Sequence, residues 1–198
     1  MTQPSLLAAL GPVLDALESL GTQYYVGGSL ASSAHGIPRA SIDADLIADL
    51  QPGDVAPLVA ALRDDYYVPE ERIRDAVARR SSFNLIHLAT MFKVDVFVAG
   101  DRTFDRRALD RARREPLEEG PSRAVPLASA EDIVLAKLEW FRKGGEVSER
   151  QWTDVIGVLR TLAEAIDSSY MEELAAELGI SDLLKRAQTE VAGSGRSA

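Results

Sequence analysis

Cysteine is absent from the 198 residues, and histidine occurs only twice, at His35 and His87. The absence of cysteine excludes disulfides, thiolate zinc sites, iron–sulfur clusters and a cysteine nucleophile. Two histidines are too few for a zinc site built mainly on imidazole. We expect His35, beside Gly36 at the end of a short helical segment, to cap that helix. His87 stands in the middle of a strand-like run and is expected to have a structural partner.

Basic residues and long apolar runs are also scarce. The chain has 22 Lys and Arg against 31 Asp and Glu, a formal net charge of -9 at pH 7. This balance argues against a general binder of polyanions, whose surface is usually basic. No stretch approaches the ~20 apolar residues of a membrane span, and the N-terminal residues lack the basic start of a signal peptide. We therefore expect a soluble, cytoplasmic protein with no membrane partner, whose chemistry rests on its surplus carboxylates.

Hydrophobic periodicity divides the chain into two parts of different character. Strand-like and helical segments alternate up to residue 127, and every segment after Ser129 has a helical pattern. The sequence predicts an α/β (α+β) fold with a core at 1–127, a helical domain at 128–190 and a disordered tail at 191–198. The expected strands are 23–26, 41–48, 82–89 and 91–98, with 116–126 as a loop or edge strand. The expected helices are 5–20, 29–34, one that Asp54 caps after the turn at 51–53, 70–80, 103–114, 129–142, 149–163, 168–178 and 181–190.

One motif in the first part joins a glycine pair to a pair of aspartates. Gly27-Gly28-Ser29 ends a strand-like run, and Asp43 and Asp45 follow after a spacer of thirteen residues. In a strand, positions i and i+2 point to the same face, so the two carboxylates lie side by side. Two like charges on a largely apolar strand repel each other and are costly to desolvate unless a cation lies between them. Mg²⁺ suits this position because it prefers carboxylate and phosphate oxygens.

Asp95 is a third carboxylate in an unusual place. It lies in the middle of the alternating run 92–98, on the face opposite Val94 and Val96, although aspartate is depleted in strands. If this strand lies next to the one that carries Asp43 and Asp45, three carboxylates converge. Such a set suits two metal ions, one activating an attacking hydroxyl and the other holding a triphosphate. The glycines would allow close backbone approach to phosphate, at the N-terminus of a helix.

This combination resembles the nucleotidyltransferase superfamily, the DNA polymerase β-like fold. The segment from Gly36 to Leu46 is also similar to a G-x-x-R-x-T-x-D-x-D-L pattern of minimal bacterial nucleotidyltransferases related to AbiEii-type abortive-infection toxins. Ser41 stands where that pattern has threonine. The resemblance covers residues 24–98 and implies a nucleotidyltransferase-type mixed sheet with flanking helices, followed by a C-terminal helical bundle.

The resemblance also implies an activity and a set of site residues. The activity is transfer of a nucleoside monophosphate from an NTP to a hydroxyl, with Mg²⁺ or Mn²⁺ as cofactor. By matching position, Gly27-Gly28-Ser29 would hold the triphosphate, and Asp43 and Asp45 would bind both metals. Asp95 would complete the metal site on the side of the nucleophile and take up its proton.

Two basic residues are further candidates for nucleotide binding. Arg39 either neutralises phosphate or forms a local salt bridge. Lys137 lies among apolar neighbours on its helix, so it either extends along the edge of the core or reaches the nucleotide, as the resemblance favours. Asp154 matches a later acidic position of the family. It faces away from the apolar stripe, however, and we expect a solvated carboxylate paired with Arg150.

A group of arginines forms a local basic patch in this acidic chain. Aspartates at 101, 105 and 110 alternate with them, which predicts a solvent-exposed face of salt bridges. A tRNA-binding edge is the alternative, although no aromatic residues for base stacking accompany the arginines. The arginines are Arg102, Arg106, Arg107, Arg111, Arg113 and Arg114.

Three functions remain open. The first is a nucleotidyltransferase that modifies an RNA end or a protein hydroxyl, as the toxin of a toxin–antitoxin or phage-defence system with a cognate antitoxin as partner. The second is a small-molecule nucleotidyltransferase of the antibiotic-modifying kind. The third is a non-catalytic relative that binds a nucleotide or a partner protein, which the three intact aspartates disfavour.

Overall fold

The computed structural model describes residues 6–36, 43–117, 123–162 and 166–194, and the chain divides into two compact units. The sheet unit comprises Met1–Gly27 and Ser41–Leu127, and the helical unit comprises Gly28–Ala40 and Ala128–Ala198. The C-terminal part of the helical unit begins after Leu127. Helix α2 (Gly28–His35), which was predicted to belong to the α/β core, groups with the helices instead.

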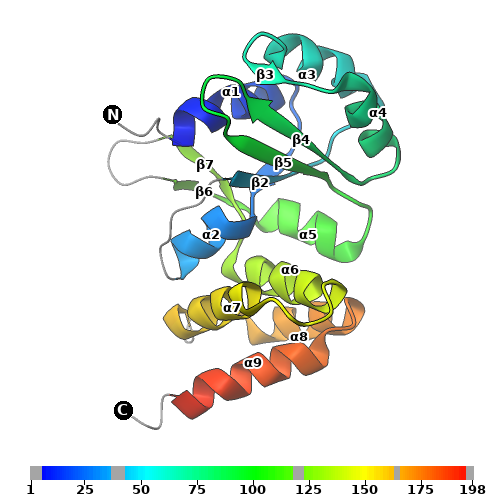
Figure 1. The fold of residues 1–198 in the computed structure, drawn as a ribbon. Coiled ribbons are helices and arrows are strands. Elements are labelled where there is room, and N and C mark those ends of the chain that lie inside the picture. Colours follow the sequence, from blue (N-terminus) through cyan, green and yellow to red (C-terminus); the bar gives the residue numbers. More distant parts are fainter. Residues whose placement is uncertain (1–5, 37–42, 118–122, 163–165, 195–198) are drawn as a thin grey trace, which may run out of the picture. The chain divides into compact units, whose positions relative to one another are not determined.

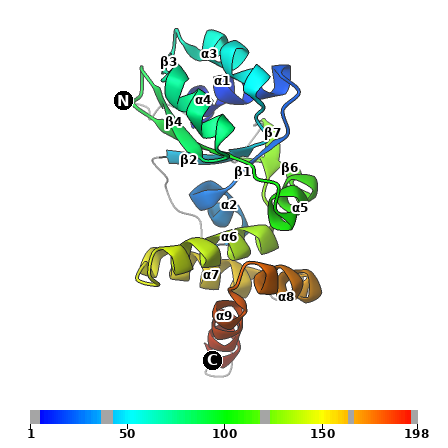
Figure 2. The same cartoon turned by 90° about the vertical axis from the view of Figure 1, so that its right-hand side faces the viewer.

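A mixed seven-stranded sheet forms the centre of the sheet unit, in the order β3-β4-β5-β2-β1-β7-β6. Helices α1 (Leu6–Ser19), α3 (Val55–Leu62) and α4 (Glu70–Ala78) lie together on one face of it (Figures 1 and 2). A 3₁₀ turn at Pro52–Asp54 precedes α3, and α5 (Thr103–Arg111) follows β5. The strands are β1 (Tyr24–Val26), β2 (Asp43–Ala48), β3 (Tyr66–Tyr67), β4 (Ser82–His87), β5 (Lys93–Val98), β6 (Arg113–Pro116) and β7 (Ala124–Leu127).

The two central strands, β2 and β5, show a strict alternation of burial. Leu46 and Val94 are fully buried, as are their alternate neighbours along each strand, whereas the intervening residues are half-buried. Burying each such Leu or Val contributes roughly 1.5–3 kcal/mol. One face of these strands is therefore anchored in the core, and this fixes the opposite face as the one that carries the aspartates.

Two strands were not expected from the sequence. Arg113 and Arg114 were predicted to end a helix, but α5 ends at Arg111 and β6 begins at Arg113, paired antiparallel with β7. The prediction was wrong because pairing with a strand later in the chain outweighs a weak local preference for helix. β3 was missed because only two residues pair with β4. It is held by Tyr66, whose buried hydroxyl donates a hydrogen bond of 2.7 Å to the carbonyl of Ala9.

The helical unit packs α2 (Gly28–His35) against α6 (Ala130–Lys143) and α7 (Glu149–Thr161), with α8 (Ser168–Glu177) and α9 (Ser181–Ser194) completing the bundle. The α2–α7 contact explains a glycine: a Cβ on Gly36 would lie 3.1 Å from the backbone nitrogen of Val158. Ser129 caps α6 as predicted, accepting a hydrogen bond from the N–H of Asp132. Helix α9 extends through residues 191–194, which had been assigned to the disordered tail.

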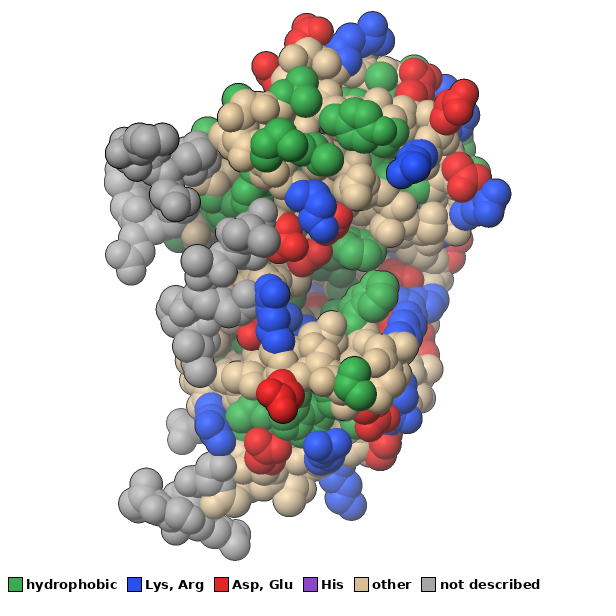
Figure 3. Space-filling view, in the orientation of Figure 1, with side chains coloured by type: hydrophobic (Ala, Val, Ile, Leu, Met, Phe, Trp, Pro, Cys, Tyr) green, Lys and Arg blue, Asp and Glu red, His purple; other side chains and the backbone are tan. Residues whose placement is uncertain are grey.

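The mixed sheet followed by a helical bundle confirms the expected fold class. Within the described parts of the chain, no helix combines the length and apolarity needed to cross a membrane. On the face shown in Figure 3, acidic and basic side chains are interspersed, with hydrophobic groups between them.

Candidate functional site

The three predicted metal ligands lie on adjacent strands of the sheet unit. Strands β2 and β5 are neighbours, the condition under which the three carboxylates were expected to converge, and they pair in parallel with Asp45 as the register partner of Asp95. Paired strands are about 4.8 Å apart, so the side chains of these two residues leave the sheet side by side. Asp43 lies two residues before Asp45 on the same half-buried face. We call Asp43, Asp45 and Asp95 the acid cluster.

Lys93 joins the acid cluster and was not singled out from the sequence. Its backbone pairs with Asp43, and its ammonium nitrogen lies 2.6 Å from Oδ2 of Asp95. This hydrogen bond to Asp95 raises the pKa of Lys93, and the negative charges of Asp43 and Asp45 act in the same direction. The signal was present in the alternation of 92–98, because position 93 must share a face with position 95.

The acid cluster fits a divalent metal by the chemistry of its donors, since carboxylate oxygens are the ligands that Mg²⁺ and Mn²⁺ prefer. In this conformation, however, no three His, Asp or Glu side chains among the described residues are grouped closely enough to hold a metal ion. The cation that contacts Asp95 is Lys93. Metal binding by the cluster therefore stays a prediction, and it would require the side chains to rearrange.

A cavity of about 180 Å³ lies beside Asp95 in the sheet unit. Asn84, the register partner of Asp95 on β4, lines it together with Phe97 and with Arg72 of α4. The cavity thus offers an amide, a guanidinium and an aromatic ring next to a carboxylate. It has room for a small polar group.

The glycine pair lies where the chain passes from the sheet unit, which includes Gly27, to the helical unit, which begins at Gly28. The N–H of Gly27 donates a hydrogen bond of 2.9 Å to the carbonyl of Asp45, which ties the end of β1 to the strand of the aspartates. Gly28 begins α2 with a φ of 54°, in the left-handed region that favours glycine. Ser29 follows in the first turn of α2 and is buried. A helix N-terminus with a hydroxyl is suited to phosphate oxygens.

Arg150 supports this turn and was missed as a candidate. Its guanidinium donates a hydrogen bond of 3.0 Å from Nη2 to Oγ of Ser29, within the helical unit. The predicted pairing of Arg150 with Asp154, four residues along the same helix, is wrong: Arg150 contacts Ser29, and Asp154 contacts Lys137. Only the packing of α7 against α2 shows that Arg150 points toward Ser29.

Lys137 and Asp154 form a buried ion pair between α6 and α7. The Lys137 nitrogen lies 2.8 Å from Oδ2 of Asp154, and the two side chains are 11% and 12% exposed. Asp154 is thus not the solvated carboxylate that we expected. The predicted contact of Lys137 with a nucleotide remains untested, and Arg39 lies outside the described residues.

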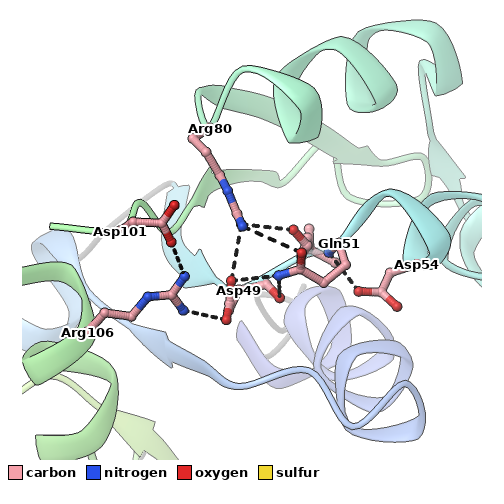
Figure 4. A network of polar contacts seen from close by, with 7 residues as sticks. Asp49, Gln51, Asp54, Arg80, Asp101 and Arg106 are labelled. Atoms are coloured by element: carbon pink, nitrogen blue, oxygen red, sulfur yellow. Dashed lines mark hydrogen bonds and ion pairs between the residues drawn. The ribbon is translucent and has the colours of Figure 1, made fainter.

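A separate polar network closes the other end of β2 (Figure 4). Asp49 accepts hydrogen bonds from Arg80 at 3.1 Å and from Arg106 at 2.5 Å, and Arg106 also pairs with Asp101. Arg80 has a φ of 49°, which costs a non-glycine residue about 1–2 kcal/mol. The network holds the loop after β2, and we assign it a structural role.

Three arginines of the basic patch form salt bridges, as expected. Arg102 contacts Asp105 at 2.8 Å, Arg106 is held by two aspartates, and Arg114 lies 3.3 Å from Glu18. These contacts agree with the predicted salt-bridged face. A tRNA-binding edge stays an untested alternative.

The two histidines have structural contacts. His87 Nδ1 lies 2.8 Å from the hydroxyl of Thr90, which confirms the expected partner. His35 does not cap its own helix: its Nε2 donates to the carbonyl of Ala128 at 2.7 Å, joining α2 to the segment before α6. The local pattern could not reveal this bond, because its two residues are far apart in the sequence.

Solved structures with a similar fold include nucleotidyltransferases. A crystal structure of the nucleotidyltransferase ANT(2″)-Ia in complex with adenylyl-2″-tobramycin matches with a TM-score of 0.52 and 14% identity, over 85% of this chain and 94% of that one. The chain has a nucleotidyltransferase-type fold. This agrees with the expectation for residues 24–98, whereas an AbiEii-type subgroup is not shown. At 14% identity, the likeness concerns the fold alone.

Two further structures are similar. A nucleotidyltransferase-like protein from Paracoccidioides brasiliensis has 17% identity and a TM-score of 0.49, over 90% of each chain. A solution structure of ANT(2″)-Ia has 11% identity and a TM-score of 0.47, over 96% of each chain. No protein-family model and no curated protein sequence matches this chain.

Proposed function

We propose that this protein is a metal-dependent nucleotidyltransferase, which moves a nucleoside monophosphate from an NTP to a hydroxyl acceptor. One observation carries the proposal: Asp43, Asp45 and Asp95 share one face of two parallel strands in a nucleotidyltransferase-type fold. Like charges on one face of a sheet repel one another, and a bound divalent cation would relieve that repulsion.

The acid cluster would hold Mg²⁺ or Mn²⁺. When bound, such ions polarise phosphate and lower the pKa of a coordinated hydroxyl. The acceptor oxygen then bonds to the α-phosphorus of the NTP as the bond to the β-phosphate oxygen breaks, and pyrophosphate leaves. Asp95 takes the proton of the acceptor hydroxyl, and Asp43 and Asp45 orient the reacting groups.

The triphosphate would be bound by the glycine pair and by Ser29. Gly28 allows close backbone approach, and Arg150 already donates to Ser29, so its guanidinium is available to a phosphate oxygen at the same place. Lys137, oriented by Asp154, and Arg39 are proposed to supply further positive charge to the nucleotide. The reaction then depends on positioning and on charge neutralisation.

The acceptor that we propose is an RNA end or a protein hydroxyl, with the protein acting as a toxin that a cognate antitoxin restrains. This follows from the resemblance of the segment Gly36–Leu46. A small-molecule acceptor of the antibiotic type is the second candidate. The 180 Å³ cavity beside Asp95 favours it, because such a space suits a small polar ring, and ANT(2″)-Ia was crystallised with adenylyl-2″-tobramycin.

The test is transfer of label from each α-labelled NTP. The protein is incubated with tRNA, with a protein mixture and with aminoglycosides in separate reactions, with Mg²⁺ or Mn²⁺. We expect label in one class of acceptor, lost with EDTA and lost in the double variant Asp43→Asn/Asp45→Asn. The variant Asp64→Asn/Asp65→Asn removes the same charge from an exposed loop and should keep the activity. Nucleotide binding without any transfer would favour the non-catalytic alternative.

A further inference from the structure

Lys93 is a cation placed at a cluster that the proposed reaction assigns to metal ions. We propose that Lys93 is a built-in counter-ion of the acid cluster, which competes with the divalent metal and must release Asp95 before the metal can bind. This inference rests on the proposed function, because it assumes that the acid cluster is the metal site. It goes further by naming a residue that sets the metal affinity of the free protein.

The backbone places Lys93 where a cation is needed. Lys93 and Asp95 are two residues apart on β5 and share one face, and their register partners on β2 are Asp43 and Asp45. These four residues form a compact block of three carboxylates and one ammonium group. Lys93 reduces the formal charge of this block from −3 to −2, which relieves the repulsion between the carboxylates.

Direct competition follows from the atoms involved. The ammonium group lies 2.6 Å from Oδ2 of Asp95, a close charge-assisted hydrogen bond. An oxygen that accepts this bond has less electron density to offer a metal, and the ammonium group repels a second cation nearby.

The exposure of Lys93 makes the competition reversible. Its side chain is 43% exposed, so the flexible stem can carry the ammonium group into solvent when a metal arrives. Lys137 in the helical unit lacks this freedom, because it is 11% exposed in its pair with Asp154. Lys93 therefore competes reversibly with a metal ion for Asp95, whereas Lys137 stays paired with Asp154 inside the helical unit.

The experiment measures Mn²⁺ affinity of the full-length protein by electron paramagnetic resonance, with isothermal titration calorimetry for Mg²⁺. Lys93→Met should bind Mn²⁺ about tenfold more tightly than the wild type, because a competing positive charge in direct contact is removed. Lys93→Gln serves as a second variant of the same kind. Lys93→Arg keeps the charge and should bind within about threefold of the wild type.

The matched control is Lys143→Met. Lys143 pairs with Glu139 at 2.8 Å and is 52% exposed, so this variant removes the same charge and a similar ion pair from the helical unit. We expect its Mn²⁺ affinity to stay within about twofold of the wild type, since the partner of Lys143 is Glu139 and not a carboxylate of the acid cluster. Asp95→Asn in the Lys93→Met background should abolish the gain. This variant links the gain to the proposed contact.

The outcomes separate the inference from the proposed function. Equal Mn²⁺ affinity in Lys93→Met, Lys143→Met and the wild type would overturn the inference, even if label transfer is observed. Tighter binding in Lys93→Met without transfer to any acceptor would support the inference and contradict the enzymatic proposal. Failure of both the wild type and Lys93→Met to bind either ion would overturn the inference and the metal site together.

Discussion

Two lysine–aspartate ion pairs, one in each unit, place the same chemistry in different surroundings. Lys137 and Asp154 are 11% and 12% exposed between two helices, whereas Lys93 and Asp95 are 43% and 22% exposed on the open face of a sheet. In the pair between the helices both charges are largely removed from water, so loss of either one leaves the other poorly solvated. In the sheet pair the lysine can leave, and the carboxylate then becomes available to a ligand.

This difference indicates how the two units divide their roles. The helical unit buries charged groups and satisfies them internally: Asp132 accepts from the hydroxyl of Tyr170 at 2.6 Å, and Glu131 accepts from the N–H of Asp167. Such bonds favour a rigid bundle. The sheet unit instead holds three half-buried carboxylates on one face, and one of them pairs with the partly exposed Lys93. That arrangement suits ligand binding better than stability.

The largest effect is expected from breaking the buried pair. Asp154→Ala leaves Lys137 charged and unpaired, and should lower the free energy of unfolding by about 3–5 kcal/mol. Asp95→Ala, the matched change in the sheet pair, should alter it by less than about 1 kcal/mol. Urea denaturation followed by circular dichroism measures both. Similar losses in the two variants would contradict the comparison.

Neutralising the acid cluster should have a large effect on activity and little on stability. Asp45→Asn removes a proposed metal ligand, so we expect nucleotidyl transfer to fall on the order of 10²–10³-fold. Its free energy of unfolding should be unchanged or higher in EDTA, because one repelling charge is lost. Initial rates with the labelled NTP and denaturation in EDTA test the two parts. A stable, fully active variant would exclude Asp45 from the site.

A smaller effect is expected from the arginine that contacts Ser29. Arg150→Ala should raise the KM for NTP roughly tenfold, with kcat changed less, because one hydrogen bond from a charged donor to the triphosphate is lost. Arg160→Ala removes an exposed arginine from the same helix and should leave KM within about twofold. A fall in kcat alone would argue against a role in binding the nucleotide.

The smallest effect is expected from breaking the sheet pair from its lysine side. Lys93→Met in EDTA should lower the free energy of unfolding by about 1 kcal/mol or less, as for other partly exposed ion pairs. Saturating Mg²⁺ should restore it, since a bound cation replaces the lost charge. Thermal unfolding with and without Mg²⁺ provides the measurement. A loss as large as that of Asp154→Ala would show that Lys93 is structural.

Much of the candidate site could be predicted because its signals are local. The alternation of a strand places Asp43 beside Asp45, and Asp95 beside Lys93, whatever the rest of the fold does. The glycine pair before a short helix is a local signal too. That β2 and β5 are neighbours could not be predicted, because the order of strands in a sheet is set by contacts between distant segments.

Other features depend on contacts between distant segments. The bond from Arg150 to Ser29 needs α7 to pack against α2, and the pair of Lys137 with Asp154 needs the facing sides of α6 and α7. A helical pattern shows which side of a helix is apolar, but not which polar residue of another helix it meets. For this reason the pairing of Arg150 with Asp154, four residues apart, was a reasonable but wrong prediction.

By itself, the sequence determined which reactive groups the protein has: no thiol, only two imidazoles, and aspartates at a fixed spacing on strands. It also determined the fold class, since periodicity is a local property of the chain. Only the tertiary structure decided that the strands of Asp45 and Asp95 are neighbours, that residues 113–116 form a strand, and that Asp154 is largely buried. These depend on free energies gained when segments distant in sequence exclude water together, which no local pattern contains.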